Sequence, residues 1–462
     1  MQDEIARARS ELERTFKERS DEIICSLLAA CAGEHVLLLG PPGTAKSQLA
    51  RSVCEAIDGS FFYYLMTRFT TPEEVFGPLS LKALQEDDFR RKTDGYLPTA
   101  HVAFLDEIFK SSSSILNSFL TILNERKFHN GREAVDVPLI AAFGASNELP
   151  DDEDNLEALY DRFLLRCVVS PIQEEENFRE MLFDDDRSVH SGILLTVDQI
   201  MNVQETARSV GIDDSVQRII LRVRKELARM GISVSDRRWK KIVNVLRVAA
   251  AAAGRSNVDR SMAILLKHMA WDRPEQREDV RGLLIDLIIS GGESLEKLAR
   301  DVSDLYGLLL RTTDRPFPYP VRCYECNEML GSSRKLASHE SDNPGHRFFD
   351  PHRTSLSPRY MGYDSLLATL KDEYRWDFVY NPNGKKREYQ MECRALKERY
   401  EMTTGKMKTE MGRLMQQLTG NVWVSDRDAA DIMHRYEAQI RRVGQIGDIM
   451  RSIEVMLERV SD

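Results

Sequence analysis

The sequence of 462 residues lacks any apolar run close to the roughly 18 residues that a membrane-spanning helix needs. Its first twenty residues alternate charges where a signal peptide would carry an apolar stretch. The seven cysteines are scattered apart from one close pair, unlike the dense and even pattern of a secreted disulfide scaffold. These absences predict a cytoplasmic protein with no transmembrane segment.

The sequence also has no excess of positive charge. It contains 64 Lys and Arg and 74 Asp and Glu residues, which gives a formal net charge of -10. A protein that mainly coats phosphate backbones needs a basic surface, so we expect no nucleic-acid partner. Glycine and proline stay near their usual frequencies and 42% of the residues are apolar, which excludes a fibrous or mainly disordered chain. The length predicts about three domains.

Short apolar runs alternate with helical patterns in the first part of the chain. Such alternation, with runs long enough only for buried strands, predicts a three-layer α/β domain around a parallel sheet. The dipeptide Asn130-Gly131 predicts a small hairpin beside it. The expected strands are 35–39, 61–65, 102–105, 139–145 and 164–169, with helices such as 48–56 and 114–125 between them.

Beyond Pro171 the pattern is helical, until three prolines between residues 316 and 320 interrupt it. The segment that follows is irregular in pattern, and two long helices are expected at 385–418 and 426–460, the second capped by Ser425 with Asp428. We therefore divide the chain into an α/β nucleotide-binding domain at 1–190, an all-helical subdomain at 191–275, a discontinuous helical domain at 276–314 and 385–462, and an insertion at 315–384.

The first expected strand is followed by Gly40-Pro-Pro-Gly-Thr-Ala-Lys-Ser47, which fits a phosphate-binding loop except that Ala45 replaces the second glycine. Backbone N–H groups and the N-terminus of the next helix can surround phosphates there. Lys46 would contact the β and γ phosphates, and Ser47 would ligate magnesium. The expected ATP-binding residues are Gly40, Pro41, Pro42, Gly43, Thr44, Ala45, Lys46, Ser47 and Gln48.

Polar residues end two further strands. The strand at 102–105 runs into Asp106 and Glu107, of which the first would hold magnesium and the second would polarise the attacking water. Asn147 follows the strand at 139–145 and can orient water or a γ-phosphate oxygen. An Asp-Glu pair alone is also compatible with a solvated loop or a helix cap. The catalytic interpretation of Asp106 and Glu107 therefore depends on the presence of the phosphate loop.

These motifs, together with Leu159-Tyr-Asp-Arg-Phe163, resemble the MoxR family of AAA+ ATPases, in which alanine before the loop lysine is usual. Residues 64–79 and 234–241 are similar to the RavA branch of that family. The resemblance covers about residues 1–275 and implies an AAA+ core with an all-helical lid, followed here by a helical stalk.

The resemblance also implies roles for single residues. Asn147 matches the sensor-1 residue, Arg162 the arginine finger offered to a neighbouring subunit, and Arg237 the sensor-2 arginine, with Arg238 as the alternative. It implies a magnesium-dependent ATPase that forms a ring, usually a hexamer, and acts as a chaperone on partners with von Willebrand factor A domains. A nucleic-acid motor and a nucleotide-gated scaffold with little turnover are the alternatives.

The insertion departs from the RavA pattern, in which a β-rich domain docks a decarboxylase. It contains Cys323-x2-Cys326-x12-His339-x6-His346, which approaches a zinc site with two cysteines and two histidines. The last spacing exceeds the usual three to five residues, and His352 is an alternative fourth ligand. Free thiols and surface histidines are the other interpretation.

Overall fold

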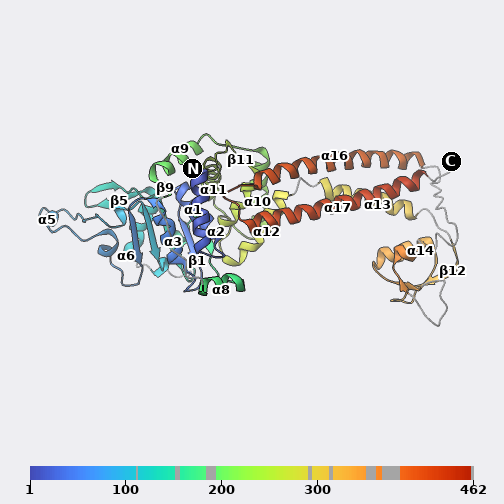
Figure 1. Ribbon diagram of the computed structural model, residues 1–462, viewed down its shortest axis with the longest axis horizontal. Coiled ribbons are helices and arrows are strands. Elements are labelled where there is room, and N and C mark those ends of the chain that lie inside the picture. The colour runs from blue at the N-terminus through green and yellow to red at the C-terminus, as the bar shows by residue number, and fades with distance from the viewer. Residues whose placement is uncertain are drawn as a thin grey trace. The chain divides into compact units, whose positions relative to one another are not determined.

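The computed structural model describes residues 1–110, 113–150, 157–183, 194–289, 294–311, 316–349, 360–366 and 386–458 (Figure 1). The chain divides into two compact units. The first comprises Met1–Ile289 with Arg413–Met433, and the second comprises Ser290–Gly412 with His434–Asp462. The domain boundaries expected from the sequence stay predictions, and the first unit continues past residue 275.

The first unit is built on a parallel sheet of five strands in the order β3-β4-β7-β1-β8 (Figure 1). Every residue of β1 and β7 is buried, because these central strands have helices over both faces. The expected parallel α/β fold is confirmed. The strands are β1 Val36–Leu39, β3 Phe61–Leu65, β4 Val102–Asp106, β7 Ala141–Ser146 and β8 Leu165–Val168.

Helices cover the sheet on both sides. The step from β1 to β3 crosses the sheet in the opposite direction to the step from β4 to β7. Right-handed crossovers therefore put α3 (Lys46–Glu55) and α6 (Ser113–Glu125) on opposite faces, as Figure 1 shows. Two N-terminal helices, α1 (Gln2–Thr15) and α2 (Ser20–Ala32), precede β1, and α2 is buried along most of its length.

The expected hairpin is confirmed as β5 (Lys127–Asn130) paired with β6 (Glu133–Asp136). Gly131 adopts a φ of 67° in its turn, a conformation that glycine reaches without strain. Three further short segments lie between β3 and β4, namely α4 (Pro72–Phe76), α5 (Leu81–Leu84) and the 3-10 turn η1 (Leu97–Thr99).

The second half of the first unit is helical. It contains α9 (Val197–Ala207), α10 (Asp214–Arg229), α11 (Asp236–Ala252), the 3-10 segment η3 (Arg260–His268) and α12 (Arg277–Ile289). Residues 413–433 pack with these helices. Trp423 is buried and its Nε1 donates to Ala249 O at 2.8 Å, while Arg281 Nε donates to Asp428 Oδ1 at 2.8 Å.

The second unit contains α13 (Ser294–Arg311) and most of α16 (Lys386–Leu418) and α17 (Asp426–Glu458). A buried apolar core joins these helices through residues such as Val302, Leu396 and Ile453. The two long helices agree with the sequence pattern, and Asp428 N donates to Ser425 Oγ at 3.3 Å as the expected cap.

The insertion is more regular than its sequence pattern indicated. Strands β12 (Pro316–Arg322) and β13 (Met329–Ser332) form an antiparallel hairpin, and α14 (Ser333–Asp342) follows directly. Two short strands, β14 (Phe348–Phe349) and β15 (Tyr360–Met361), pair nearby. Within the described residues the insertion therefore contains regular elements, since prolines that stop a helix are compatible with an extended strand at a sheet edge.

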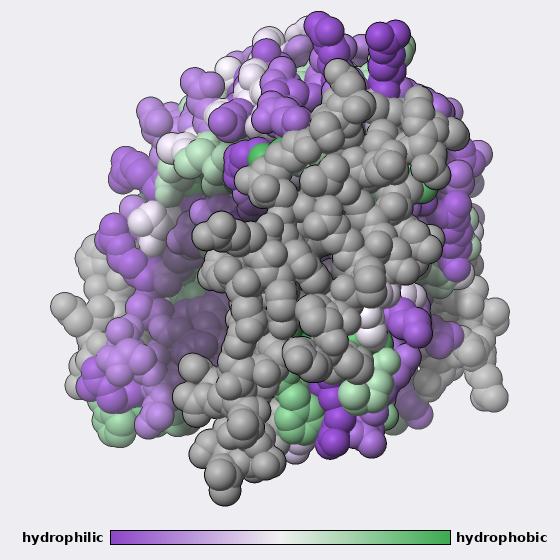
Figure 2. Space-filling view, turned by 90° about the vertical axis from the view of Figure 1, so that its right-hand side faces the viewer, coloured by the Kyte–Doolittle hydropathy of each residue, from purple (hydrophilic) through white to green (hydrophobic). Residues whose placement is uncertain are grey.

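None of the described helices is long and apolar enough to cross a membrane. Around the grey atoms in Figure 2, hydrophilic side chains predominate and apolar ones form only small separate groups. Among the described residues visible on that face there is therefore no broad apolar patch.

Candidate active site

The loop Gly40–Ser47 joins β1 to α3 and has the shape that a phosphate group requires. A Cβ atom on Gly40 would lie 2.1 Å from Val169 O, so only glycine fits there. Gly43 and Ala45 have positive φ angles of 80° and 62°. At position 45 glycine would adopt this conformation freely, whereas alanine pays about 1 kcal/mol. The loop therefore keeps its turn although the second glycine is missing.

Lys46 lies at the centre of this loop and is 7% exposed. Its Nζ donates to Gly40 O at 2.6 Å, to Pro41 O at 2.8 Å and to Asn147 Oδ1 at 2.9 Å. Burial lowers the pKa of Lys46, although the charges of Asp106 and Glu107 oppose this shift. The ammonium group is thus held where the phosphates of a nucleotide would lie.

The polar residues at the carboxyl ends of β1, β4 and β7 form one hydrogen-bonded network. Ser47 Oγ donates to Asp106 Oδ2 at 2.7 Å, which brings together a hydroxyl and a carboxylate suited to magnesium. Asn147 Nδ2 donates to Glu107 Oε1, and Asn147 Oδ1 accepts from Lys46. The structure therefore brings together five of the residues that the sequence singled out.

Arg162 and Arg237 lie together elsewhere. Burial, and then the charge of Arg237, lower the pKa of Arg162. The Nε of Arg162 is buried and has no hydrogen-bond partner within the described residues, while its Nη1 lies 3.8 Å from Asp161 Oδ2. Arg237 is exposed on α11 and its Nη2 donates to Asn124 Oδ1 at 2.9 Å.

These two arginines lie at the edge where the strands of the sheet begin. His35, directly before β1, has its Nε2 2.8 Å from Leu123 O, so the end of α6 with Asn124 lies at that edge. Arg162 itself precedes β8. The Gly40–Ser47 loop lies at the opposite edge, where the strands end. The arginines are therefore separated from the loop of their own chain by the length of the sheet.

Comparison with known proteins agrees with this geometry. Residues 3–201 match the family model described as the MoxR domain in the MoxR-vWA-beta-propeller ternary systems, and residues 215–284 match that of an AAA lid domain. An uncharacterized protein of Methanocaldococcus jannaschii is 43% identical over 273 residues, 59% of this chain and 72% of that protein. The chain belongs to the MoxR family of AAA+ ATPases.

A second uncharacterized protein of Methanocaldococcus jannaschii is 41% identical over 302 residues, covering 65% of this MoxR chain and 79% of its own length. A crystal structure from Cytophaga hutchinsonii is 17% identical with a TM-score of 0.49, covering 62% of this chain and 94% of that one. Membership of the family implies the use of ATP and magnesium, and the parallel sheet with its helical lid is the AAA+ core. The narrower similarity to the RavA branch stays a prediction.

Beside the phosphate loop of this MoxR chain lies a cavity of about 380 Å³. Its apolar lining includes Phe16, Ile172, Phe178 and Met181, and Gln48 from the expected ATP-binding set lines it too. Phe178 and Met181 project from α8 (Glu175–Phe183), where they are 47% and 39% exposed. The sequence analysis missed these residues, although their helical spacing of three on α8 was a signal.

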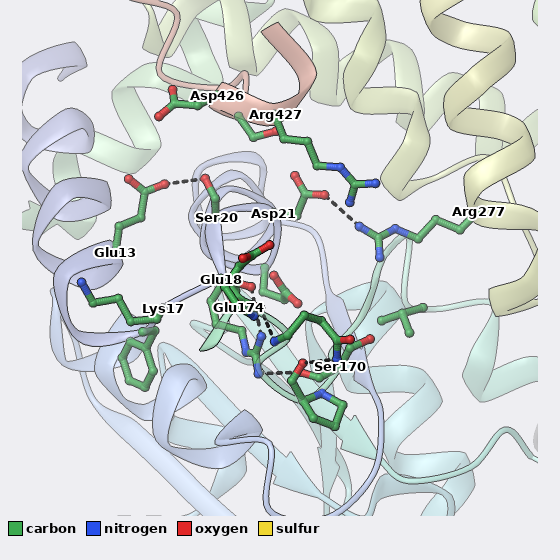
Figure 3. A pocket seen from close by; sticks show the side chains of 17 residues that line it. Glu13, Lys17, Glu18, Ser20, Asp21, Ser170, Glu174, Arg277, Asp426 and Arg427 are labelled. Atoms are coloured by element: carbon green, nitrogen blue, oxygen red, sulfur yellow. Dashed lines mark hydrogen bonds and ion pairs between the residues drawn. The ribbon is translucent and has the colours of Figure 1, made fainter. Parts of the chain in front are cut away.

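The connection between α1 and α2 holds α8 in place at this cavity. Both carboxylate oxygens of Glu18 accept hydrogen bonds, from Gln173 N at 2.8 Å, Glu174 N at 2.9 Å and Asn177 Nδ2 at 3.0 Å. Burial would raise the pKa of Glu18, but these hydrogen bonds hold it below its usual value. Figure 3 shows Glu18 beside Glu174 in an adjoining polar pocket of about 600 Å³. Glu18 therefore holds the segment that leads into α8 and the Asn177 side chain on its first turn.

Arg238, the alternative sensor arginine, is buried and hydrogen-bonded within the protein. It is 6% exposed, and its guanidinium donates to Asp272 Oδ1 at 2.9 Å and to Trp271 O at 3.2 Å. These bonds hold it inside the helical subdomain. Of the adjacent pair, only Arg237 presents its side chain to solvent.

The cysteines and histidines of the insertion converge on one point. The four ligand atoms of Cys323, Cys326, His339 and His346 all lie within 4.8 Å of one another. Cys326 Sγ lies 3.0 Å from His339 Nε2, and Cys323 Sγ lies 3.5 Å from His346 Nδ1. Tetrahedral zinc would separate sulfur and nitrogen by about 3.6 Å. Two thiols and two imidazoles are a donor set that suits zinc, and the Cys323–His346 separation matches this value, whereas Cys326 and His339 lie closer than zinc would hold them. The alternative ligand His352 lies outside the described residues.

Proposed function

We propose that this chain is a magnesium-dependent ATPase whose subunits assemble into a ring, and that it remodels or activates a partner protein bearing a von Willebrand factor A domain. The observation that carries hydrolysis is the network in which Asn147 connects Lys46 with Glu107 while Ser47 meets Asp106. The partner class is supported by the wording of the matching family model, which names MoxR-vWA systems.

In this proposal each residue of the network has one task. Lys46 would contact the β and γ phosphates, and Ser47 with Asp106 would hold a magnesium ion, whose charge would stabilise the phosphates. Glu107 polarises the attacking water. Asn147 bonds both Lys46 and Glu107, so it is placed to respond when a γ-phosphate arrives between them.

Ring assembly is supported by the position of the two arginines. Arg162 and Arg237 lie at the edge where the strands begin, whereas the phosphate loop lies where they end. They therefore serve the nucleotide of an adjacent subunit better than their own. Six subunits are proposed from the resemblance to the MoxR family.

A trapped complex tests the partner class. Full-length chain carrying Glu107→Gln, loaded with ATP and magnesium, should retain a purified von Willebrand factor A-domain protein from the same source, since it binds ATP without hydrolysing it. Lys46→Ala, which cannot bind ATP, is the matched control and should retain none. Retention that does not depend on ATP, or hydrolysis stimulated strongly by DNA instead of by the partner, would contradict the proposal.

Glu18 holds the segment before α8, and α8 lines the cavity in which we propose that the base of ATP binds. This arrangement gives a prediction about ATP affinity. Glu18→Gln removes the negative charge that accepts from two backbone N–H groups, which weakens the attachment of α8 by about 1.5 kcal/mol. The KM for ATP should therefore rise roughly tenfold. The kcat should change little, because Glu18 is not part of the Lys46 network. Steady-state kinetics separates the two constants. Glu176→Gln, whose carboxylate pairs with Arg179 on exposed α8 surface, should leave both unchanged.

We further propose that Cys323, Cys326, His339 and His346 bind zinc and that the insertion recognises a partner. Within the described residues, the apolar core of this segment is small and consists of Val321, Cys323, Leu330, Leu336, Phe348 and Leu366. So few buried side chains do not stabilise an independent fold, and metal binding would supply the missing free energy.

Removal of one exposed ligand tests the zinc site. Cys326→Ser should abolish zinc binding in the insertion and make residues 316–349 susceptible to proteolysis, while basal ATP hydrolysis stays intact because the active site is elsewhere. Cys326 is exposed, so the substitution leaves the small core unchanged. Cys393→Ser, which alters a cysteine of α16, is the control. Loss of ATPase activity together with zinc would mean that the insertion belongs to the catalytic assembly.

A further inference from the structure

A second group of metal-ligating side chains lies inside the first unit, outside both sites described above. It consists of Cys25 on α2, Cys167 on β8 and His268 at the end of η3, and one ligand atom of each lies within 4.8 Å of the others. Each of the three residues is at most 1% exposed. Three elements far apart in the sequence thus bring two thiols and an imidazole to one enclosed point.

The separation between the Cys167 sulfur and the His268 ring nitrogen fits a metal ion. Cys167 Sγ lies 3.7 Å from His268 Nδ1. A metal bound to sulfur at about 2.3 Å and to nitrogen at about 2.05 Å would separate them by about 3.6 Å in tetrahedral and about 3.8 Å in trigonal geometry. The observed separation is therefore one that ligation produces without moving either side chain far.

The surroundings leave the imidazole poorly satisfied. His268 Nε2 is buried and has no hydrogen-bond partner within the described residues, and the ring otherwise contacts the thiols of Cys25 and Cys167, which are weak hydrogen-bonding groups. Burying such a ring without good partners costs free energy. A metal bond to Nδ1 would replace the weak contact with the thiols by a strong bond, and two thiolates would balance the charge of a divalent ion in the core.

Asp21, an acidic residue close to Cys25, has no free carboxylate oxygen to offer as a fourth ligand. Lys267 Nζ donates to Asp21 Oδ1 at 2.6 Å and Arg277 Nη2 donates to Asp21 Oδ2 at 2.8 Å, while the main-chain oxygen of Asp21 lies 3.9 Å from Cys167 Sγ. Two thiolates and one imidazole select thiophilic ions with flexible coordination, of which zinc and copper(I) are the common ones.

We propose that Cys25, Cys167 and His268 hold a buried thiophilic metal ion, zinc or copper(I), that fastens α2, β8 and η3 to one another. The ion pair between Lys267 and Asp21 already joins η3 to the start of α2. The metal adds a link to the edge strand of the sheet, so the helical half of the unit is tied to the α/β half. This role is structural and does not depend on the proposed ATPase reaction.

Metal analysis of the full-length chain tests the site. Inductively coupled plasma mass spectrometry, which distinguishes zinc from copper, should show that Cys167→Ala lowers the metal content by about one ion per chain. Cys31→Ala is the matched control, since Cys31 is also buried on α2 but outside the cluster, and it should keep the wild-type content. Cys326→Ser should remove only the ion of the insertion, so the two sites are counted separately.

A second measurement tests the site even if the Cys167→Ala variant does not fold. Chain carrying Cys326→Ser, refolded with cobalt(II), should show the near-ultraviolet charge-transfer band of thiolate-bound cobalt. Absence of that band, an unchanged metal content in Cys167→Ala, or an intact mass showing a Cys25–Cys167 disulfide would each overturn the proposal.

Discussion

Replacement of Lys46 by Ala should abolish ATP binding, whereas Glu107→Gln should preserve binding and stop hydrolysis. Lys46 supplies the ammonium group at the centre of the loop, and each hydrogen bond to a charged phosphate contributes about 1.5–3 kcal/mol. Loss of two such bonds weakens binding by roughly 10²-fold to 10⁴-fold. Glu107 acts on water instead, and loss of a general base lowers turnover by about 10²-fold to 10⁴-fold.

Calorimetry for nucleotide affinity and a phosphate-release assay for turnover separate the two effects. Glu148→Gln is a matched control for the loss of one acidic charge, because Glu148 follows Asn147 and its carboxylate is not part of the Lys46 network. It should bind and hydrolyse ATP normally. Equal loss of nucleotide affinity in the Lys46 and Glu107 variants would refute the role given to Glu107.

Arg162→Ala should bind ATP with nearly wild-type affinity and hydrolyse it very slowly. An arginine finger supplied to a neighbouring subunit contributes about 10³-fold to 10⁵-fold to turnover in well-studied GTPases. Arg162 fits this task because its Nε is buried without a hydrogen-bond partner in the described part of the chain, and because it lies across the sheet from its own phosphate loop. Asp161→Asn, beside it, should retain most activity.

Mixed assemblies decide whether Arg162 acts between subunits. Chains with Arg162→Ala and chains with Lys46→Ala are each inactive alone, but in a mixed ring an intact loop can face an intact arginine, and part of the activity should return. The two variants need different affinity tags, so that rings containing both can be isolated. If such rings stay inactive, Arg162 acts within its own subunit or only packs at the interface.

The α/β fold of the first unit could be predicted from the sequence alone, because it depends on local sequence patterns. The central strands consist of apolar residues because helices cover both of their faces, so β1, β4 and β7 appear as short apolar runs. The phosphate loop is equally local, since its turn and the following helix lie within a few residues. The network around Asn147 followed from one topological fact, that parallel strands end at the same edge of a sheet.

The tertiary structure decided the features that depend on residues distant in the chain. The cavity beside the phosphate loop combines Phe16 with Ile172 and Phe178, and Glu18 binds the backbone just before a helix that begins at residue 175. Arg237 lies beside Arg162 because of how the helical half packs against the sheet edge.

The same distinction separates the two groups of cysteine and histidine. In the insertion Cys323 and Cys326 are three residues apart, and the chain returns two histidines soon afterwards, so the spacing is visible in the sequence. Cys25, Cys167 and His268 are each separated by about a hundred residues or more. Their convergence follows only from the packing of α2 and η3 on β8, because side-chain periodicity reports which face of an element is buried but not which neighbour covers it.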